Sequence, residues 1–318
     1  MFLSFAPMEG ITGAGFRRVH RRMFPEADQY YAPFIAPDAG GRFKQSHLRA
    51  LLPDNNRGIP LVPQILANSA SAFLGAAETL AELGYTEVNL NAGCPSGTVV
   101  AKHKGAGMLA DLDTLAAFLD EVFDRCPLEI SIKTRMGLNS TDEFPRILAI
   151  YQRYPVKELI VHARDRVGMY RSEPDLGGFA EALRACRCPI CYNGNVFTGH
   201  DLDALAARFP ALQRVMLGRG AVANPALFRQ LKGGRALQRE ELREFHGQLL
   251  EEALAEGLAP QHAMARMKEL WFYFSRLFPG SEKPMKAVYK ARALSDYRDA
   301  TARLFDEAIF DSLRGFDG

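Results

Sequence analysis

Short apolar runs recur along the first three-quarters of the chain, and most are separated by segments with helical spacing. We predict eight strands, over residues 2–6, 29–34, 61–66, 87–91, 128–133, 158–162, 189–193 and 214–218. Several of these runs are apolar throughout their middle, which is typical of strands buried on both faces. Residues 71–83 and 112–125 each carry an apolar stripe at helical spacing.

This alternation of strand and helix predicts parallel β-α-β units. Eight such units in about 230 residues match a closed (β/α)₈ TIM barrel, which typically needs about 250 residues. An open, doubly wound sheet is the alternative. No G-x-G-x-x-G follows the first strand, which weakens the dinucleotide-binding version of that alternative.

The pattern changes after Lys232-Gly233-Gly234, where strand-like alternation ends. Helical spacing then dominates over residues 240–256, 262–278, 284–294 and 299–313, with breaks at Pro260 and at Pro279-Gly280. We therefore expect two domains, a barrel over residues 1–233 and a small helical bundle over residues 238–318.

Composition supports a folded chain that works in the cytoplasm. The 318 residues are 47% hydrophobic and 24% charged, as in ordinary globular proteins. We find no run of eighteen apolar residues and therefore expect no membrane span. The first residues resemble a strand rather than a signal peptide, and five cysteines without an export signal favour free thiols in a reducing compartment. We expect a cytoplasmic monomer.

Charge is unevenly distributed within the predicted helical domain. Residues 239–258 carry two arginines and six glutamates, a net charge of −4, whereas residues 264–303 carry nine basic and four acidic residues, a net charge of +5. A local basic region fits an electrostatic footprint for phosphates. A solvated helix face would produce the same pattern, and this feature alone favours that simpler interpretation.

Polar residues gather where seven of the predicted strands end, and in a barrel those ends converge on one pocket. These positions include Ala6 to Gly10, Gln64, Asn89 to Pro95, Lys133 to Arg135, His162 to Arg164, Asn193 to Asn195, and Gly218 to Gly220. Each buried polar group needs a partner, so packing alone does not explain the whole set. The sequence therefore predicts an active site at this end of the barrel.

The last two of these strand ends are rich in glycine. Asn193-Gly194-Asn195 and Gly218-Arg219-Gly220 follow the seventh and eighth strands. Barrels bind phosphate at this place through backbone N–H groups. We therefore expect a phosphorylated cofactor or substrate there, with Arg219 adding positive charge.

These motifs, taken in order, resemble the tRNA-dihydrouridine synthases. The resemblance rests on Ala6-Pro7-Met8, Asn91-x-Gly93-Cys94-Pro95, Lys133-x-Arg135, His162-x-Arg164, Asn193-Gly194 and Gly218-Arg219-Gly220. It covers nearly the whole barrel, and the helical tail is similar to that family's RNA-binding domain. The resemblance implies FMN as a tightly bound cofactor, NADPH or NADH as reductant, and a uridine of the tRNA D-loop as substrate.

The chemistry of that reaction assigns roles to the residues. Saturating the uracil C5=C6 bond needs a hydride from a reduced flavin and a proton from the protein. A cysteine thiol, whose pKa is ordinarily about 8.5, can supply that proton at neutral pH, and Cys94 is our candidate. Lys133 and Gln64 are expected at the pyrimidine edge of the flavin. The remaining candidates are Asn91, Arg135 and Tyr170 for the substrate, and Pro7, Met8, Glu9, His162, Asn193, Gly194, Asn195, Gly218 and Arg219 for the cofactor.

Two other functions compete with this hypothesis. A small-molecule flavin barrel, similar to dihydroorotate or dihydropyrimidine dehydrogenases, would need neither a helical domain nor a basic stretch. A non-enzymatic RNA-binding protein on a decayed barrel would not keep Cys94, Lys133, Arg135 and His162 together. A zinc site at Cys186, Cys188 and Cys191 is disfavoured because the spacing is too tight, and we predict no metal.

Overall fold

The computed structural model describes residues 1–316, which fall into two compact units. The first, here called the barrel unit, comprises residues 1–7, 29–194 and 206–216. The second, the helical unit, comprises residues 8–28, 195–205 and 217–318, of which 317 and 318 lie outside the described residues. These units do not follow the expected boundary at residue 233, so the assignment of functional domains to residues 1–233 and 238–318 stays a prediction.

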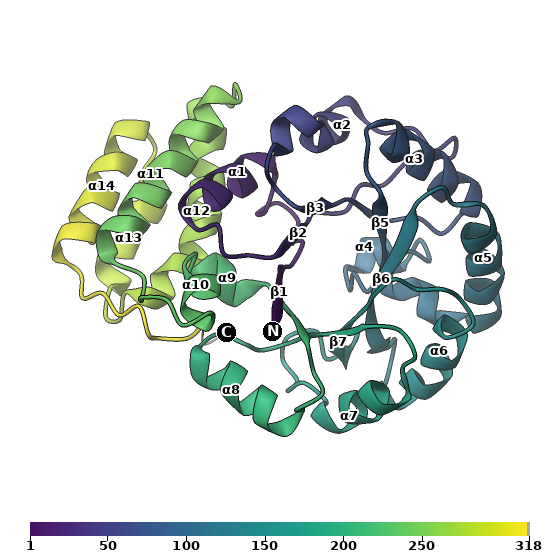
Figure 1. Ribbon diagram of the computed structural model, residues 1–318. Coiled ribbons are helices and arrows are strands. Elements are labelled where there is room, and N and C mark those ends of the chain that lie inside the picture. The colour runs from purple at the N-terminus through teal and green to yellow at the C-terminus, as the bar shows by residue number, and fades with distance from the viewer. Residues whose placement is uncertain (317–318) are drawn as a thin grey trace. The chain divides into compact units, whose positions relative to one another are not determined.

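The barrel unit is built on one parallel sheet with the strand order β3-β2-β1-β9-β8-β7-β6-β5-β4. The strands are β1 (Phe2–Phe5), β2 (Gln29–Tyr31), β3 (Leu61–Val62), β4 (Gln64–Ile65), β5 (Glu87–Ala92), β6 (Glu129–Gly137), β7 (Leu159–Asp165), β8 (Ile190–Asn193) and β9 (Arg214–Leu217). Only Pro63 separates β3 from β4, because proline has no N–H to donate to a ladder. This interrupted strand pairs with β2 on one side and β5 on the other, which closes the sheet into the predicted barrel (Figure 1).

Helices connect the strands on the outside of the barrel (Figure 1). Those with most or all of their residues in this unit are α2 (Gln45–Leu51), η1 (Pro53–Asn56), α3 (Ala70–Glu82), α4 (Gly97–Val100), η2 (Gly105–Ala110), α5 (Leu112–Arg125), η3 (Thr141–Glu143), α6 (Phe144–Tyr151) and α7 (Leu176–Ala185). The Asp111 carboxylate begins α5 by accepting hydrogen bonds from the N–H groups of Asp113 and Thr114. Buried Leu115, Leu119 and Val122 form its inner stripe, as predicted.

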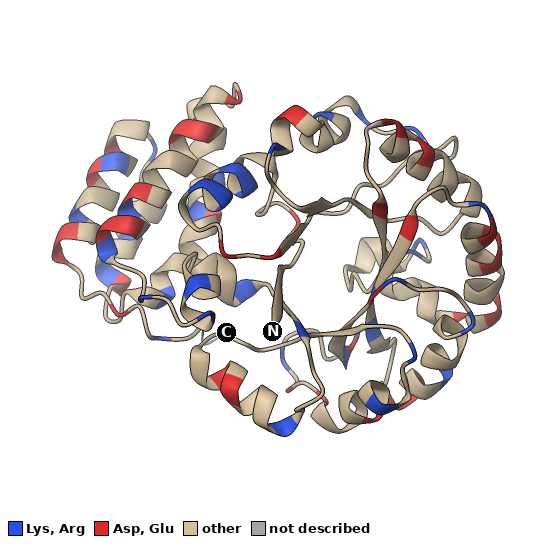
Figure 2. Ribbon diagram, viewed as in Figure 1, with Lys and Arg blue, Asp and Glu red and all other residues tan. Residues whose placement is uncertain are grey.

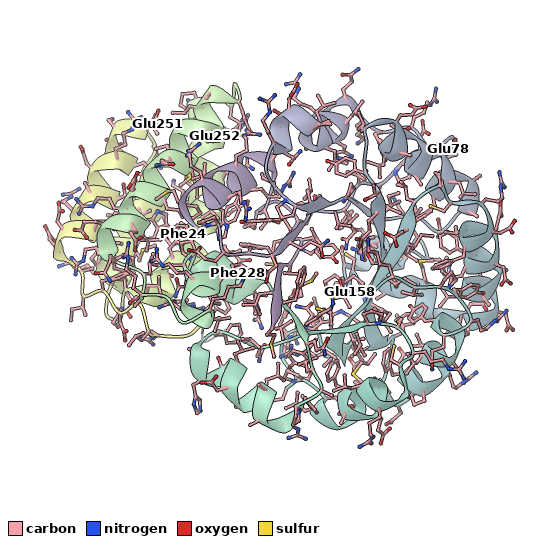
Figure 3. The ribbon with its side chains drawn as sticks, in the orientation of Figure 1. Phe24, Glu78, Glu158, Phe228, Glu251 and Glu252 are labelled. Carbon is pink, nitrogen blue, oxygen red and sulfur yellow. The ribbon has the colours of Figure 1, made fainter. Side chains whose placement is uncertain are left out.

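The barrel interior is packed rather than open. A buried core cluster is formed by Ala6, which directly follows β1, and by one residue from each of five strands: Tyr31, Val62, Ile160, Cys191 and Met216. The Tyr31 hydroxyl donates a 2.7 Å hydrogen bond to buried Glu158, and the Arg214 guanidinium lies 3.2 Å from the same carboxylate. Figure 3 labels Glu158 inside the ring of strands and Glu78 on the outer helix α3. Cys191 therefore serves as a core side chain.

The helical unit holds the remaining helices. They are α1 (Ala14–Met23), α8 (Gly199–Arg208, whose last residues belong to the barrel unit), α9 (Arg219–Ala223), α10 (Leu227–Leu231), α11 (Arg239–Ala255), α12 (Pro260–Phe274), η4 (Ser275–Leu277), α13 (Glu282–Lys290) and α14 (Leu294–Glu307). Trp271 of α12 is fully buried, and its indole N–H donates to the Tyr297 hydroxyl at 2.9 Å. The C-terminal helical region predicted from the sequence is confirmed.

The acidic helix α11 is neutralised by α1 within this unit. The Arg18 guanidinium of α1 forms ion pairs with Glu252 and Glu256, and Arg22 donates to the side chain of Gln248. Figure 2 shows this pairing as basic segments on α1 and acidic segments on α11. With Glu241 and Glu251, which pair with other arginines, four of the six glutamates in residues 239–258 have ion-pair partners within the helical unit.

Several predicted ends differ from the structure; β2, for example, ends at Tyr31 rather than residue 34. β6 continues to Gly137 and β7 to Asp165, so Lys133, Arg135 and His162 lie within strands rather than at their ends. These strands are longer because they pair with each other as far as Gly137 and Asp165. Helix α14 ends at Glu307 rather than residue 313, since the chain then turns and packs Phe310 against Phe278 at a ring distance of 5.4 Å.

None of the helices within residues 1–316 is both long enough and apolar enough to cross a lipid bilayer.

Candidate active site

The predicted site residues that lie on strands of the barrel unit share one continuous face of the sheet. The register pairs Gln64 with Asn89, Asn91 with Lys133, Arg135 with His162, and His162 with Asn193. Side chains of paired residues, and of residues two apart along a strand, point to the same face. Ile160 shares this face with His162 and belongs to the interior core, so the face is the inside of the barrel.

The Cys94 turn is held by the side chain of Asn91. After β5, the Asn91 carboxamide oxygen accepts hydrogen bonds from the N–H groups of Gly93 at 3.1 Å and Cys94 at 2.9 Å. Cys94 itself is half-buried. The asparagine of the Asn-x-Gly-Cys-Pro motif therefore fixes the backbone from which the thiol projects.

Gln64 and Asn91 are joined in a hydrogen-bonded row of amides. The Asn91 amide donates to the Gln64 oxygen at 2.8 Å, and the Gln64 amide donates to the Asn89 oxygen at 2.7 Å. Sequence reasoning assigned Gln64 and Asn91 to different ligands and did not single out Asn89. Alternate residues of a strand point to the same face, so the positions of residues 87, 89 and 91 could have identified Asn89 from the sequence.

Lys133 lies beside Asn91 on the adjacent strand. Its side chain is half-buried, and among residues 1–316 no hydrogen bond or ion pair reaches its ammonium group. Burial, and to a smaller extent the nearby Arg135 charge, lowers the pKa of Lys133 to about 8. A lysine in this environment is suited to receive an anionic group from a ligand.

Arg135 links the Cys94 turn to the loop that follows β7. Its guanidinium donates to the carbonyl oxygens of Gly93 at 3.0 Å and Asp165 at 2.8 Å. It also lies 5.9 Å from the centre of the Tyr170 ring, and Tyr170 is 47% exposed. Burial is the main cause of a lowered Arg135 pKa. The structure thus places Arg135 and Tyr170 close together, and Arg135 also holds two backbone carbonyl groups.

His162 is buried between Arg164 and Tyr170. The His162 Nε2 atom lies 3.1 Å from an Arg164 guanidinium nitrogen, and the His162 and Tyr170 ring centres are 5.7 Å apart. Because an arginine can only donate, Nε2 must accept, and the proton of a neutral ring lies on Nδ1. Arg164 also donates to the Ser172 carbonyl at 2.6 Å, which ties down the loop after β7.

Asn193 and Gly194 end the next strand. The Asn193 amide donates to the carbonyl oxygen of Met216 at 2.9 Å, which joins β8 to β9. A Cβ atom added at Gly194 would lie only 2.2 Å from the Tyr192 hydroxyl oxygen. A side chain at position 194 would therefore collide with the buried ring of Tyr192.

The other cofactor candidates belong partly to the helical unit. There, the Arg219 guanidinium donates to the Asn195 side chain at 3.0 Å, and Gly218 immediately precedes the short helix α9. Pro7 follows β1 at the edge of the barrel unit, and Met8 and exposed Glu9 belong to a tight turn that the Thr12 side chain closes. Partial burial raises the pKa of Glu9.

The cysteine-rich segment before β8 brings two thiols together. The Cys186 and Cys188 sulfurs lie 3.3 Å apart, and hydrogen bonding from Cys188 is the main reason that the Cys186 pKa falls to about 7. In the part of the chain that the structure describes, no cluster of three His, Cys, Asp or Glu side chains could hold a metal ion.

Comparison with known proteins gives a consistent result. Residues 4–307 match the family model for dihydrouridine synthase (Dus). The chain is 28% identical to the tRNA-dihydrouridine(16) synthase of Aquipseudomonas alcaligenes, with 88% of this chain and 92% of the relative covered. It is 25% identical to tRNA-dihydrouridine synthase B of Pseudomonas putida, with 99% and 94% covered.

Solved structures share the fold of this chain. Morphinone reductase superimposes with a TM-score of 0.54 at 13% identity, covering 74% of this chain and 86% of the other. The old yellow enzyme of Trypanosoma cruzi gives a TM-score of 0.53 at 10% identity, covering 74% and 89%. At these identities the likeness concerns the fold.

Proposed function

Since the chain belongs to the dihydrouridine synthase (Dus) family, we propose that it is a flavin-dependent enzyme that reduces a uridine of tRNA to dihydrouridine. The observation that carries the proposal is the position of Lys133. Its half-buried ammonium group, without an ion pair in residues 1–316, lies beside Asn91, which holds the Cys94 turn. A positive charge for an anionic ligand ring therefore lies on β6, and a proton donor lies on the turn directly after the neighbouring strand β5.

The residues of the barrel face fit a flavin, which we propose to be FMN. When bound, it would supply the hydride, taken from NADPH or NADH. Lys133 would offset negative charge on its pyrimidine edge, and Gln64 would offer its remaining amide hydrogen to the same edge. His162 lies on the same inner face and is the further proposed contact of the flavin ring. Support comes from the shared inner face and from the absence of a competing carboxylate near Lys133 among residues 1–316.

Three candidate residues for the phosphate group lie within the helical unit. Asn195 and Arg219 are hydrogen-bonded to each other, and Gly218 leaves the backbone before α9 uncovered by a side chain. We propose that these three residues bind the FMN phosphate. Pro7, Met8, Glu9, Asn193 and Gly194 remain proposed cofactor contacts on the strength of the sequence.

Cys94 is the proposed proton donor to uracil C5. Its thiol is half-buried on a turn whose Gly93 and Cys94 N–H groups both donate to the Asn91 oxygen, so the backbone that carries the thiol is fixed before substrate arrives. Asn91, Arg135 and Tyr170 are the proposed substrate contacts. Tyr170 has the exposed ring that a base could stack upon, and the Arg135 charge lies close behind it.

The proposed substrate is a D-loop uridine of tRNA, bound by a cytoplasmic monomer. In the helical unit, Lys283, Lys286, Lys290 and Arg292 are exposed and have no ion pair with any described residue. By contrast, Arg266 lies 3.4 Å from Glu256, and Lys268 donates to the Ala291 carbonyl at 2.6 Å. The exposed four favour phosphate binding, and they disfavour the alternative of a small-molecule pyrimidine reductase.

The test is direct reduction of tRNA by the purified protein. The released flavin is identified by chromatography, and tRNA from a strain lacking this gene is incubated with the enzyme and NADPH or NADH. Digestion and mass spectrometry should reveal one uridine that has gained two hydrogens, and sequencing locates it. Turnover of free uracil or dihydroorotate with no change in tRNA would instead establish the small-molecule alternative.

A further inference from the structure

A chain of buried polar side chains runs through the barrel wall from Glu87 to the Cys94 turn. Ser131 donates to the Glu87 carboxylate at 2.7 Å, and the Asn89 amide donates to the Ser131 hydroxyl at 2.9 Å. Asn89 in turn accepts from Gln64, which accepts from Asn91. The chain therefore joins three strands, β4, β5 and β6.

The two ends of this chain impose a single direction on every bond in it. At one end the Glu87 carboxylate can only accept, and at the other end the backbone N–H groups of Gly93 and Cys94 can only donate. Each group between them must accept from one neighbour and donate to the next. The orientations of the Asn89, Gln64 and Asn91 amides are thus determined by chemistry, and reversing one would leave a bond unmade.

Packing does not require these residue types. The outward positions of the same strands hold Val88, Leu90, Ile130 and Ile132, which are fully or nearly fully buried. Asn89 and Ser131 are completely buried as well, although apolar side chains could fill such positions. A buried polar network is costly unless all its members are satisfied, so its presence on the inner face calls for a functional reason.

We infer that Glu87, Ser131 and Asn89 are positioning residues for the Cys94 thiol, acting through Gln64 and Asn91. They hold the Asn91 oxygen toward the backbone N–H groups of the Cys94 turn. As a result, Gln64 and Asn91 each keep one amide hydrogen that is not used within residues 1–316. Lys157 supports the far end, since its ammonium group lies 3.0 Å from the Glu87 carboxylate. The inference rests on the proposed function for its catalytic meaning, whereas the positioning of Cys94 can be measured without it.

The test compares Ser131→Ala with Ser4→Ala in the full-length, flavin-loaded protein. Both serines are fully buried on barrel strands, but the Ser4 hydroxyl has no hydrogen-bond partner among residues 1–316. The first readout is the rate of Cys94 alkylation by iodoacetamide as a function of pH, with half-buried Cys126 as the internal standard. Ser131→Ala should shift the Cys94 profile and leave Cys126 unchanged, while Ser4→Ala should move neither.

The second readout separates positioning from a general loss of structure. Ser131→Ala should lower kcat for tRNA by roughly 10–100-fold with KM changed less than about two-fold, because the reacting group is misplaced rather than the substrate unbound. Glu87→Gln, which keeps an acceptor for Ser131, should stay within about three-fold of wild type, whereas Glu87→Leu should resemble Ser131→Ala.

The inference is overturned if Ser131→Ala matches Ser4→Ala in both the alkylation profile and kcat, or if Glu87→Gln is as impaired as Glu87→Leu. Should the wild-type protein fail to reduce tRNA, the proposed function falls. The alkylation profiles still decide the positioning role in that case.

Discussion

The ammonium group of Lys133 is half-buried with no ion pair in residues 1–316, and burial is the main reason that its pKa falls to about 8. A lysine whose pKa is lowered by folding destabilises the folded protein while it is charged. The unfolded chain binds the proton more tightly than the folded chain does. At the scale of the residue, binding of an anionic ring would offset the cost of burying the Lys133 ammonium group.

Replacing Lys133 by Met should therefore stabilise the flavin-free protein while abolishing flavin retention. At pH 7 the free energy of unfolding should rise by roughly 1–3 kcal/mol, since the penalty for the charge disappears. The gain should shrink as the pH rises from about 8 towards 10.5, because over this range the folded wild-type protein has lost the charge on Lys133 while the unfolded chain still binds the proton. Urea unfolding at pH 7 and pH 10 measures this, and a variant destabilised equally at both values contradicts it.

Replacing Cys94 by Ala removes the proposed proton donor and little else. Single-turnover reduction of tRNA should slow by about 10²–10⁴-fold, the usual contribution of a general acid. Flavin content and tRNA affinity should stay unchanged, because the backbone N–H groups that bind Asn91 remain. Cys126→Ala, at another half-buried thiol, is the control. Stopped-flow oxidation of the reduced enzyme at wild-type rate would remove Cys94 from the mechanism.

At the scale of the element, the sequence predicted which strands exist more securely than where the side chains on them point. All eight predicted strands are present, because apolar runs bounded by turn residues record burial directly. The row from Glu87 through Ser131 to Gln64 was not predicted, since it depends on the register between β4, β5 and β6. Likewise, no pattern in the sequence indicated that Arg135 would bind the Gly93 and Asp165 carbonyls.

Gly220 offers a test of packing at the start of α9. A Cβ atom there would lie 2.9 Å from the Val196 carbonyl oxygen and 3.0 Å from the Phe197 ring. Gly220→Ala should destabilise the protein by about 1–3 kcal/mol, because the first neighbour is backbone that cannot rotate away. At Gly199, in α8, a Cβ atom would meet nothing within 4 Å, so Gly199→Ala should be neutral or slightly stabilising. Thermal unfolding compares the two, and equal melting temperatures contradict the prediction.

At the scale of the whole molecule, the ion-pair partners of charged residues say more about their role than the net charge of a segment does. The acidic stretch around Glu252 pairs with α1, while Lys283, Lys286, Lys290 and Arg292 have no ion pair with any described residue. The sequence located the basic region correctly but could not separate these cations from Arg266, which has a carboxylate beside it.

Replacing Lys286, Lys290 and Arg292 together by Ala should weaken binding to tRNA in general. The slope of log affinity against log salt should fall by about two to three units, because fewer counterions are released. Flavin content and its reduction by the nicotinamide cofactor should not change. A matched control, Arg184, Arg187 and Arg208 to Ala, removes three exposed positive charges elsewhere. If both triple variants keep the wild-type salt slope, the helical unit does not bind the tRNA backbone.

Trp271 is the only tryptophan in the chain, and it is fully buried in the helical unit. Emission excited at the red edge of protein absorbance therefore comes from that unit alone, whereas the colour of a flavin held by Lys133 would report on the barrel unit. With its flavin bound, the protein would carry two built-in optical probes, one of the helical core around Trp271 and one of the proposed site at Lys133. Melting it while watching both signals would reveal whether the two units unfold in one step or in sequence, without attaching any label.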